Sequence, residues 1–164
     1  GVQTCALPIL VKKNTWGRYT WLLFHTCVYK VKNENDYNTI NTLKSFVSRI
    51  CNLIPCSTCR EHSIEYLRKN NINTVKTKTE LKLYLYKFHN NVNKMLGEPV
   101  LDVSTCDKIY ENKILKNVLY NFHKILNVIN YAANYMFLSK KKINFTNEYV
   151  NYFRNNIQIG RAHV

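Results

Sequence analysis

Hydrophobic residues recur every three or four positions along most of this chain, which is the spacing of one face of an α-helix. The clearest stripe contains Ile40, Leu43 and Val47, and Ile50 and Ile54 continue it. The same period defines three other segments. The predicted helices cover about residues 15–31, 37–53, 55–67 and 78–96. A further helical pattern covers about 104–138, and a last short helix is predicted near 147–155.

Residues with known preferences for helix ends stand at the boundaries of these segments. Asp36 precedes the second helix, where an Asp side chain can cap free backbone N–H groups. Pro55 ends that helix or begins the next one. Gly97 suits the left-handed turn after a helix, and Pro99 prevents the helix from continuing. The pattern therefore predicts an all-α protein.

Composition supports a folded helical domain. The chain has 164 residues, 46% of them hydrophobic, which suffices for one domain with a core and excludes wholesale disorder. Only 4 Gly and 3 Pro disfavour a loop-rich β-sandwich. The net charge of +14 indicates a basic surface or an acidic partner. No apolar run reaches the ~18 residues of a membrane span, so we expect no membrane association.

The two ends of the chain differ in character from the rest. Codons can be chosen so that the stretch encoding residues 4–9 is nearly the reverse complement of the one encoding 159–164. Both stretches also resemble translations of a common sequencing-library adapter. We therefore expect residues 1–9 and 158–164 to be adapter-derived, and we leave them out of the fold argument. The start lacks the basic stretch of a signal peptide, and no targeting signal is visible.

The cysteines carry the first chemical signal. One lies in the doubtful N-terminal stretch, and the odd number that remains does not make a secreted disulfide framework. Cys56 and Cys59 form a C-x-x-C motif, which has three ordinary interpretations: a redox dithiol, half of a zinc site, or chance. We expect Cys27 and Cys51 to be buried free thiols in helices, and Cys106 to be an unpaired loop thiol.

The C-x-x-C motif stands at the predicted start of a helix. There the unpaired N–H groups and the helix dipole stabilise a thiolate at Cys56. One helical turn brings the Cys56 and Cys59 sulfurs within bonding reach, so the pair can cycle between dithiol and disulfide. Arg60 and His62 add positive character nearby. A thioredoxin-like site needs βαβ units, so the helical surroundings favour a flavin-type redox site.

Two more motifs flank the C-x-x-C at distances of about thirty residues. W-G-R-x-x-W-x-x-x-H stands before it at residues 16–25, and H-N-x-V-N stands after it at 89–93. In this order and spacing, the three motifs resemble those of the Erv/ALR sulfhydryl oxidases, FAD-dependent enzymes that make disulfides. The segment 109–115 resembles the short forms encoded by large cytoplasmic DNA viruses. The resemblance covers about residues 16–115, the whole catalytic domain.

The resemblance implies a four-helix bundle with FAD at its mouth and a short fifth helix, over about residues 12–115. A helical C-terminal extension would follow over 116–157. Cys59 would be the sulfur beside the flavin, and Cys56 the outer sulfur that exchanges with substrate. The other motif positions would contact FAD. They are Gly17, Arg18, Trp21, His25 and Tyr29 in the first helix, His89, Asn90, Val92, Asn93 and Lys94 in the fourth, and Tyr110 beside the adenine.

The residue types agree with this assignment. His89 and Asn93 are four positions apart and share a helix face with Asn90. A flavin site needs a flat aromatic cavity, polar anchors and positive charge for the pyrophosphate. Trp21 supplies the aromatic surface, the His/Asn cluster supplies the anchors, and Arg18 or Lys94 supplies the charge.

The resemblance also implies a direction of electron flow. The Cys56–Cys59 pair would take electrons from a dithiol protein and pass them to FAD and then to O2, giving hydrogen peroxide. No second C-x-x-C is present as an internal shuttle, so we expect a separate thiol protein to react directly with Cys56. A homodimer is implied and, for a viral form, the host cytoplasm, where disulfides are otherwise rare. We expect neither nucleic acid nor a membrane as a partner.

Two positions depart from the family pattern. Glu98 stands where a basic residue is common, which weakens the case for a phosphate contact there. Val103 stands where cellular members carry a Cys of an additional disulfide, and Cys106 has no obvious partner.

An alternative from another class is a zinc-stabilised, basic, helical nucleic-acid-binding module. Its ligands would be Cys51, Cys56, Cys59 and His62, which have a zinc-like spacing. The basic residues are spread along the chain and not clustered on one helix, which argues against this module. We therefore expect no bound metal. A non-catalytic scaffold with degenerate motifs is the third possibility, and a yellow flavin colour of the purified protein distinguishes the oxidase from the other two.

Overall fold

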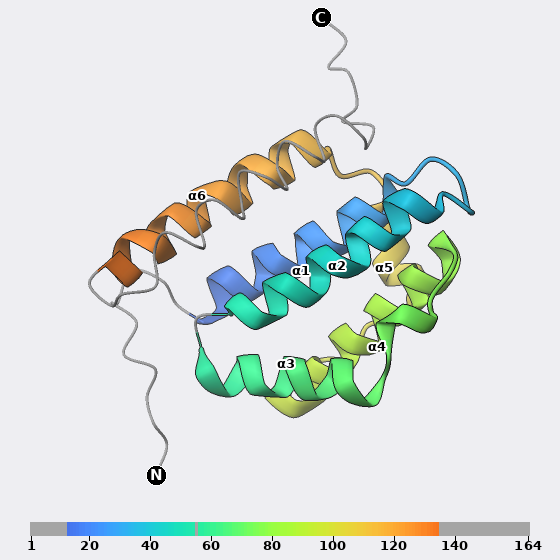
Figure 1. Cartoon of the computed structure of the whole chain (residues 1–164). Helices are drawn as coiled ribbons and strands as arrows, with labels where there is room; N and C mark the ends of the chain where they lie inside the picture. Colours follow the sequence, from blue (N-terminus) through green and yellow to red (C-terminus); the bar gives the residue numbers. More distant parts are fainter. Residues whose placement is uncertain (1–12, 55, 135–164) are drawn as a thin grey trace, which may run out of the picture.

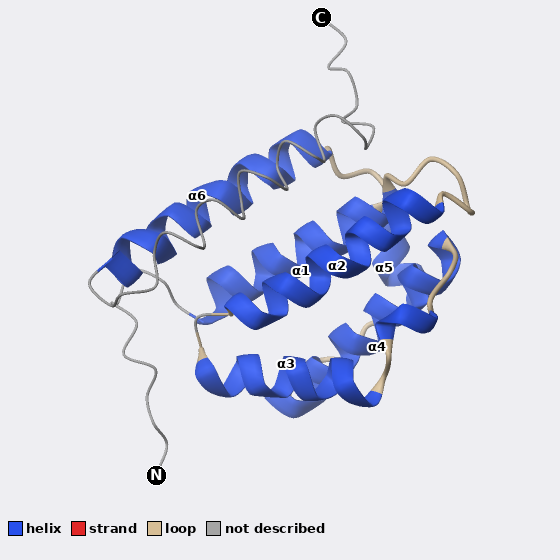
Figure 2. Cartoon of the chain, in the orientation of Figure 1, coloured by secondary structure: helices blue, strands red, loops and turns tan. Residues whose placement is uncertain are grey.

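The computed structural model describes residues 13–54 and 56–134, and every regular element in them is a helix (Figure 2). The elements are α1 (Lys13–Tyr29), α2 (Tyr37–Leu53), α3 (Ser57–Lys69), the 3-10 turn η1 (Ile72–Thr74), α4 (Lys78–Leu96), α5 (Val103–Tyr110) and α6 (Leu115–Asn134). The all-α fold expected from the sequence, with a short fifth helix, is confirmed. The predicted helix near 147–155 and the two doubtful ends lie outside the described residues.

The helix ends follow the local sequence. Asp36 caps α2, because its Oδ1 accepts a hydrogen bond from the backbone N–H of Thr39 at 3.1 Å. Thr77 and Glu80 form a capping box at the start of α4, in which each side chain accepts from the other residue's backbone N–H. At the end of α4, Gly97 adopts a φ of 69°, the left-handed conformation that favours glycine.

Helix α1 lies at the centre of the molecule, with other helices on two sides (Figure 1). α2 runs beside it, α6 lies along one side of it, and α3 and α4 lie on the other side. Leu23 and Cys27 of α1 are fully buried, and Val28 is nearly so. A helix with so few exposed apolar side chains needs cover on all its faces.

Helix α6 supplies that cover on one side of α1. Its buried side chains belong to the same hydrophobic core: Leu115, Val118, Leu119 and Phe122. The start of the segment expected as a C-terminal extension thus packs on the bundle. None of the helices in the described part of the chain is long and apolar enough to cross a membrane.

The helical pattern over 104–138 is divided in the structure into α5 and α6. The break falls at residues 111–114, which are all exposed. α5 directs Tyr110 onto His25 of α1, whereas α6 runs along α1, so the two helices cannot share one axis. The expectation that Cys106 lies in a loop is wrong: it lies in α5 and is buried, because it is on the face of α5 that packs against the bundle.

Candidate active site

Cys56 and Cys59 stand at the N-terminus of α3. Cys56 is the N-cap residue, and its Sγ accepts a hydrogen bond from the backbone N–H of Cys59 at 3.4 Å. The Sγ atoms of the two cysteines lie 2.6 Å apart. The pair is therefore placed to form a disulfide bond, and the helix N-terminus stabilises a thiolate at Cys56 when that bond opens.

The Arg60 side chain holds the residues that precede α3 in place. Its Nη1 donates a hydrogen bond to the carbonyl oxygen of Ile54 at 2.9 Å, which ties the end of α2 to the first turn of α3. The two cysteines differ in accessibility. Cys56 is 7% exposed, whereas Cys59 is partly exposed. Of the two residues, Cys59 is the more exposed.

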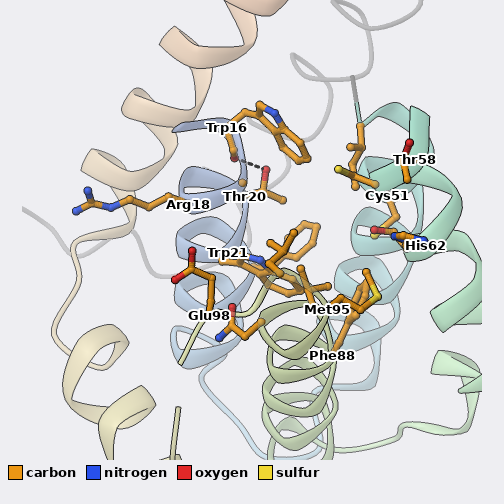
Figure 3. A pocket seen from close by; sticks show the side chains of 18 of the residues that line it. Trp16, Arg18, Thr20, Trp21, Cys51, Thr58, His62, Phe88, Met95 and Glu98 are labelled. Carbon is orange, nitrogen blue, oxygen red and sulfur yellow. Dashed lines mark hydrogen bonds between the residues drawn. The ribbon is translucent and has the colours of Figure 1, made fainter. Parts of the chain in front are cut away.

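A cavity of about 840 Å³ lies between α1, α3 and the C-terminal half of α4 (Figure 3). Cys59 lines it and Cys56 does not. Trp21 stands near the middle of the wall, close to Phe88 and Met95. Of the residues that the sequence assigns to cofactor binding, five line the cavity: Gly17, Arg18, Trp21, Val92 and Asn93. One cysteine of the C-x-x-C motif and five of the eleven expected cofactor contacts thus surround one cavity.

Two features of the wall suit a large planar ligand. Gly17 lies inside α1, where a glycine costs roughly 1 kcal/mol relative to alanine, yet a Cβ there would meet no atom within 4 Å. Packing within the protein does not require this glycine, whereas a ligand lying close to the α1 backbone would. In addition, Nε1 of Trp16 is buried and has no hydrogen-bond partner, which leaves a donor for a ligand oxygen or nitrogen.

Four rings form a row behind the cavity wall, and this row consists of two stacked pairs. The ring of His89 lies parallel to that of Trp21, with centroids 4.2 Å apart and an 8° angle between planes. His25 stacks on Tyr110 in the same way, at 4.3 Å and 12°. A hydrogen bond between His25 Nε2 and His89 Nδ1, 3.1 Å long, joins the two pairs. The predicted contacts His25, His89 and Tyr110 are thus brought together, and Trp21 connects them to the cavity.

Burial keeps both histidines neutral. It lowers the pKa of His25 to about 3, with a smaller effect from the neighbouring His89. It lowers the pKa of His89 to about 4. A neutral pair can share one proton between the facing nitrogens, one ring donating and the other accepting. Burial also raises the pKa of Tyr110 to about 12, with a smaller effect of the nearby Cys106, so its hydroxyl stays protonated.

Asn90 and Asn93 hold the loop that follows α4. The Asn90 side chain donates to the carbonyl oxygen of Leu101 at 2.8 Å and accepts from the N–H of Leu101 at 2.9 Å. Asn93 Nδ2 donates to the carbonyl oxygen of Pro99 at 3.2 Å. Because Pro99 and Leu101 line the cavity, these two amides shape one side of it.

The remaining predicted contacts lie at different places. Tyr29 donates its hydroxyl proton to Asp107 of α5 and does not line the cavity. Lys94 is exposed and is also absent from the wall. Arg18 lines the cavity, but its side chain extends away from Trp21 (Figure 3). Direct contact of these side chains with a cofactor stays a prediction.

Sequence reasoning assigned no cofactor role to several wall residues. Among them are Trp16, Thr20, Cys51, Thr58 and Phe88. Trp16 opens the first motif and Phe88 immediately precedes the third, so their places in the motifs were a usable signal. Cys51 faces the cavity from another helix, a relationship that spacing along the chain does not reveal. Burial raises the pKa of its thiol to about 12, and a hydrogen bond with Ser63 opposes the shift.

The ligands of the zinc alternative do not form a metal site. Within residues 13–54 and 56–134, no group of three or more His, Cys, Asp or Glu side chains is arranged to hold a metal ion. Cys51 and Cys27 are fully buried thiols, as expected from the sequence. The geometry therefore does not support that module.

Comparison with known proteins decides the family. Residues 18–113 match the sequence model of the Erv1/Alr family. The chain belongs to the Erv1/Alr family. The match contains the C-x-x-C and H-N-x-V-N motifs and begins at Arg18 of the first motif. The match ends just before α6, so α6 lies outside the matched residues.

Viral proteins are among the Erv1/Alr relatives of this chain. It is 30% identical over 109 residues to the FAD-linked sulfhydryl oxidase of African swine fever virus (isolate Pig/Kenya/KEN-50/1950), a match that covers 64% of this chain and 87% of the relative. It is 27% identical over 104 residues to a putative FAD-linked sulfhydryl oxidase of Invertebrate iridescent virus 6, covering 60% of this chain and 94% of the relative.

A solved Erv1/Alr structure shares the fold. The crystal structure of the FAD-binding domain of Erv1 from Saccharomyces cerevisiae superposes with a TM-score of 0.56 and 24% sequence identity. The alignment covers 62% of this chain and 96% of the yeast domain. The helical arrangement around the cavity is therefore that of the Erv1/Alr fold.

Proposed function

We propose that this protein is an FAD-dependent sulfhydryl oxidase that forms disulfide bonds in a protein partner. One observation carries the proposal. A C-x-x-C pair with sulfurs 2.6 Å apart stands at a helix N-terminus, and its second cysteine, Cys59, lines a cavity together with Gly17 and Trp21. The names of the viral relatives agree with this function.

The cavity wall supports FAD as the cofactor. Gly17 and Trp21 of α1, with Val92 and Asn93 of α4, would hold it, and Arg18 lies near enough to add positive charge. His89 stacks on Trp21 on the side away from the cavity. His25, which stacks on Tyr110, is hydrogen-bonded to His89. When bound, FAD accepts the two electrons of a dithiol and passes them to O2, which gives hydrogen peroxide.

The two cysteines divide the thiol chemistry. A substrate thiolate attacks Cys56 Sγ of the Cys56–Cys59 disulfide, a mixed disulfide forms, and Cys59 leaves as a thiolate. The second substrate thiol then attacks the substrate sulfur of the mixed disulfide, which releases Cys56 and leaves a disulfide in the substrate. The α3 N-terminus favours the released Cys56 thiolate. Because Cys59 lines the cavity, it is the sulfur placed to deliver electrons there.

The accessibility of Cys56 bears on the partner. With 7% of the residue exposed, a flat protein surface would not reach its sulfur. We expect the partner, a separate thiol protein, to present its cysteine on a narrow protruding segment. A homodimer and a location in the host cytoplasm follow from the family resemblance and stay predictions. Sedimentation of the purified protein tests the first, and fractionation of expressing cells tests the second.

The function is tested on purified protein by flavin absorbance and by oxidation of a reduced protein dithiol. Wild type should be yellow and should consume O2. Cys56→Ser and Cys59→Ser should keep bound flavin and lose turnover by at least a hundredfold, since a single thiol cannot supply two electrons through a disulfide. Glu61→Ala, which changes an exposed residue of α3 that does not line the cavity, is the control and should turn over normally.

Two results would contradict the proposal. The first is a Cys56→Ser variant that binds flavin and oxidises protein dithiols at the wild-type rate. The second is wild-type protein that is colourless and contains zinc, which would favour the nucleic-acid-binding alternative.

A further inference from the structure

Tyr29, Lys82 and Asp107 form one contact group where α1, α4 and α5 meet. The Tyr29 hydroxyl donates a hydrogen bond to Asp107 Oδ1. The ammonium group of Lys82 lies 3.0 Å from the same oxygen and 4.2 Å from the centre of the Tyr29 ring. Each of the three side chains therefore contacts the other two, and each comes from a different helix. We call this group the α5 latch.

Helix α5 depends on contacts of this kind. It has 8 residues, too few for a helix to be stable on its own. Its only buried side chains are Cys106 and Tyr110, while Val103 and Ile109 are 49% and 37% exposed. Apolar burial alone therefore anchors α5 weakly. A second polar contact stands at its C-terminal end, where Lys30 Nζ donates to the carbonyl oxygen of Glu111 at 2.9 Å.

The electrostatics agree with a closed latch. The hydrogen bond from Tyr29 and, after it, the one from Lys82 hold the pKa of Asp107 below its ordinary value, so its carboxylate is charged at neutral pH. Burial and the adjacent carboxylate raise the pKa of Tyr29, so its hydroxyl keeps the proton that it donates. The Tyr29 hydroxyl is therefore able to donate and the Asp107 carboxylate to accept, as their hydrogen bond requires.

A chain of ring contacts leads from the latch to the cavity. Asp107 and Tyr110 are three positions apart and lie on the same face of α5. Tyr110 stacks on His25, which is hydrogen-bonded to His89. His89 stacks on Trp21, and Trp21 lines the cavity. A shift of α5 would therefore disturb the His25–His89 pair, and through it the imidazole on which the Trp21 ring stacks.

We propose that Tyr29, Lys82 and Asp107 are positioning residues that hold α5 against α1 and so keep the Tyr110–His25–His89–Trp21 stack in the orientation that binds FAD. The inference rests on the proposed function. It gives Tyr29 a role through α5, whereas the motif resemblance assigned it a direct cofactor contact.

The test measures flavin binding by apoprotein titrated with FAD, followed by flavin fluorescence. Tyr29→Phe keeps the ring beneath Lys82 and removes the hydroxyl, so its FAD dissociation constant should rise roughly fivefold. Asp107→Ala removes the acceptor shared by Tyr29 and Lys82, and the constant should rise roughly tenfold. The double variant should bind like Asp107→Ala alone, because the hydroxyl then has no acceptor to lose.

A spectroscopic signal follows the stack without any flavin. Trp16→Phe leaves Trp21 as the only tryptophan of the chain. In that background, the near-ultraviolet circular dichroism of Trp21 should weaken in Tyr29→Phe apoprotein, because His89, on which the ring stacks, is then held less firmly through His25 and Tyr110. Glu65→Ala is the matched control. It removes an exposed carboxylate paired with Arg68 on α3, and it should change neither the flavin affinity nor the Trp21 signal.

The outcomes separate this inference from the proposed function. Wild-type protein that takes up no flavin overturns the proposed function and this inference with it. Wild-type protein that binds flavin, with latch variants that lose thermal stability but bind FAD equally well, overturns the latch alone. Additive effects in the double variant, roughly fiftyfold together, also contradict it, because they would mean that Tyr29 and Asp107 act independently.

Discussion

His25 Nε2 lies 3.1 Å from His89 Nδ1, although the two residues are 64 positions apart in the chain. The bond joins α1 to α4 and connects the rings of Trp21 and Tyr110 through two imidazoles. It requires at least one neutral ring, since two imidazolium groups would offer no acceptor. The pair therefore makes both the fold and the site sensitive to acid.

We predict that the free energy of unfolding falls as the pH drops below about 6.5. The folded-state pKa values of His25 and His89 are about 3 and about 4, whereas unfolded histidine titrates near 6.5. Between these values the unfolded chain binds more protons, so stability decreases by about 1.4 kcal/mol per pH unit for each histidine. Urea denaturation at several pH values from about 7.5 to about 5 measures this slope.

His89→Gln should lose about half of this slope, because one of the two titrating groups is gone. Asn91→Gln is the control, since Asn91 is exposed and neither side chain titrates, so the slope should not change. Carboxylates with lowered pKa values, such as Asp102 and Glu65, act only below about pH 5, where unfolded carboxyls titrate. If the free energy of unfolding of the wild-type protein stays constant from about pH 7 to about pH 5, the prediction is wrong.

Two glycine-to-alanine substitutions should have opposite effects on the apoprotein. Gly17→Ala should stabilise it by about 0.5–1 kcal/mol, because alanine favours the helix and its methyl group meets no atom. The same methyl group would stand on the cavity wall, so FAD affinity should fall. Gly97→Ala should destabilise the apoprotein by about 1 kcal/mol, since φ is 69° there.

Thermal unfolding of both apoproteins, with FAD titration of each, checks this pair. The expected signature is a Gly17→Ala variant that is more stable and binds flavin less tightly. Equal or tighter flavin binding by Gly17→Ala would mean that the space beside Gly17 is not used by the cofactor.

Asn90→Ala should disturb the cavity although Asn90 does not line it, because its partner Leu101 does. The substitution removes both hydrogen bonds to Leu101 and leaves that backbone N–H and carbonyl without their present partners. We expect a loss of about 2 kcal/mol in unfolding free energy and a weaker affinity for FAD. Asn91→Ala, the exposed neighbour, should change neither quantity. Equal effects of the two variants in urea denaturation would refute the role of the Asn90–Leu101 hydrogen bonds.

The packing of α6 on α1 can be tested by one side chain. Phe122 is 4% exposed and lies in the core shared with α1, so Phe122→Ala should cost about 3–5 kcal/mol of stability. Tyr120 is 60% exposed, and Tyr120→Ala should cost less than about 0.5 kcal/mol. If Phe122→Ala unfolds at the wild-type urea concentration, α6 is not part of the folded core.

Much of the helical structure was predictable because its causes are local. The stripe of Ile40, Leu43 and Val47 predicts α2, and all three side chains are buried in it. Asp36 and Gly97 act at helix ends through their own side chain or their own φ angle. The C-x-x-C motif also needs only one turn of helix to bring its sulfurs together. Residues close in sequence determined these features.

The tertiary structure alone decided which faces of these helices meet. The periodicity of α1 does not reveal that α6 covers one side of it. Nor does it reveal that Tyr29 is hydrogen-bonded to Asp107 and is not part of the cavity wall. Nor does it show that Cys51 faces the same cavity as Cys59. Such relationships depend on the rotation and crossing of helices, which arise from side chains far apart in the chain packing into one core. Local residue patterns thus specify the helices and the chemistry they carry, whereas long-range packing places the reactive groups around one cavity.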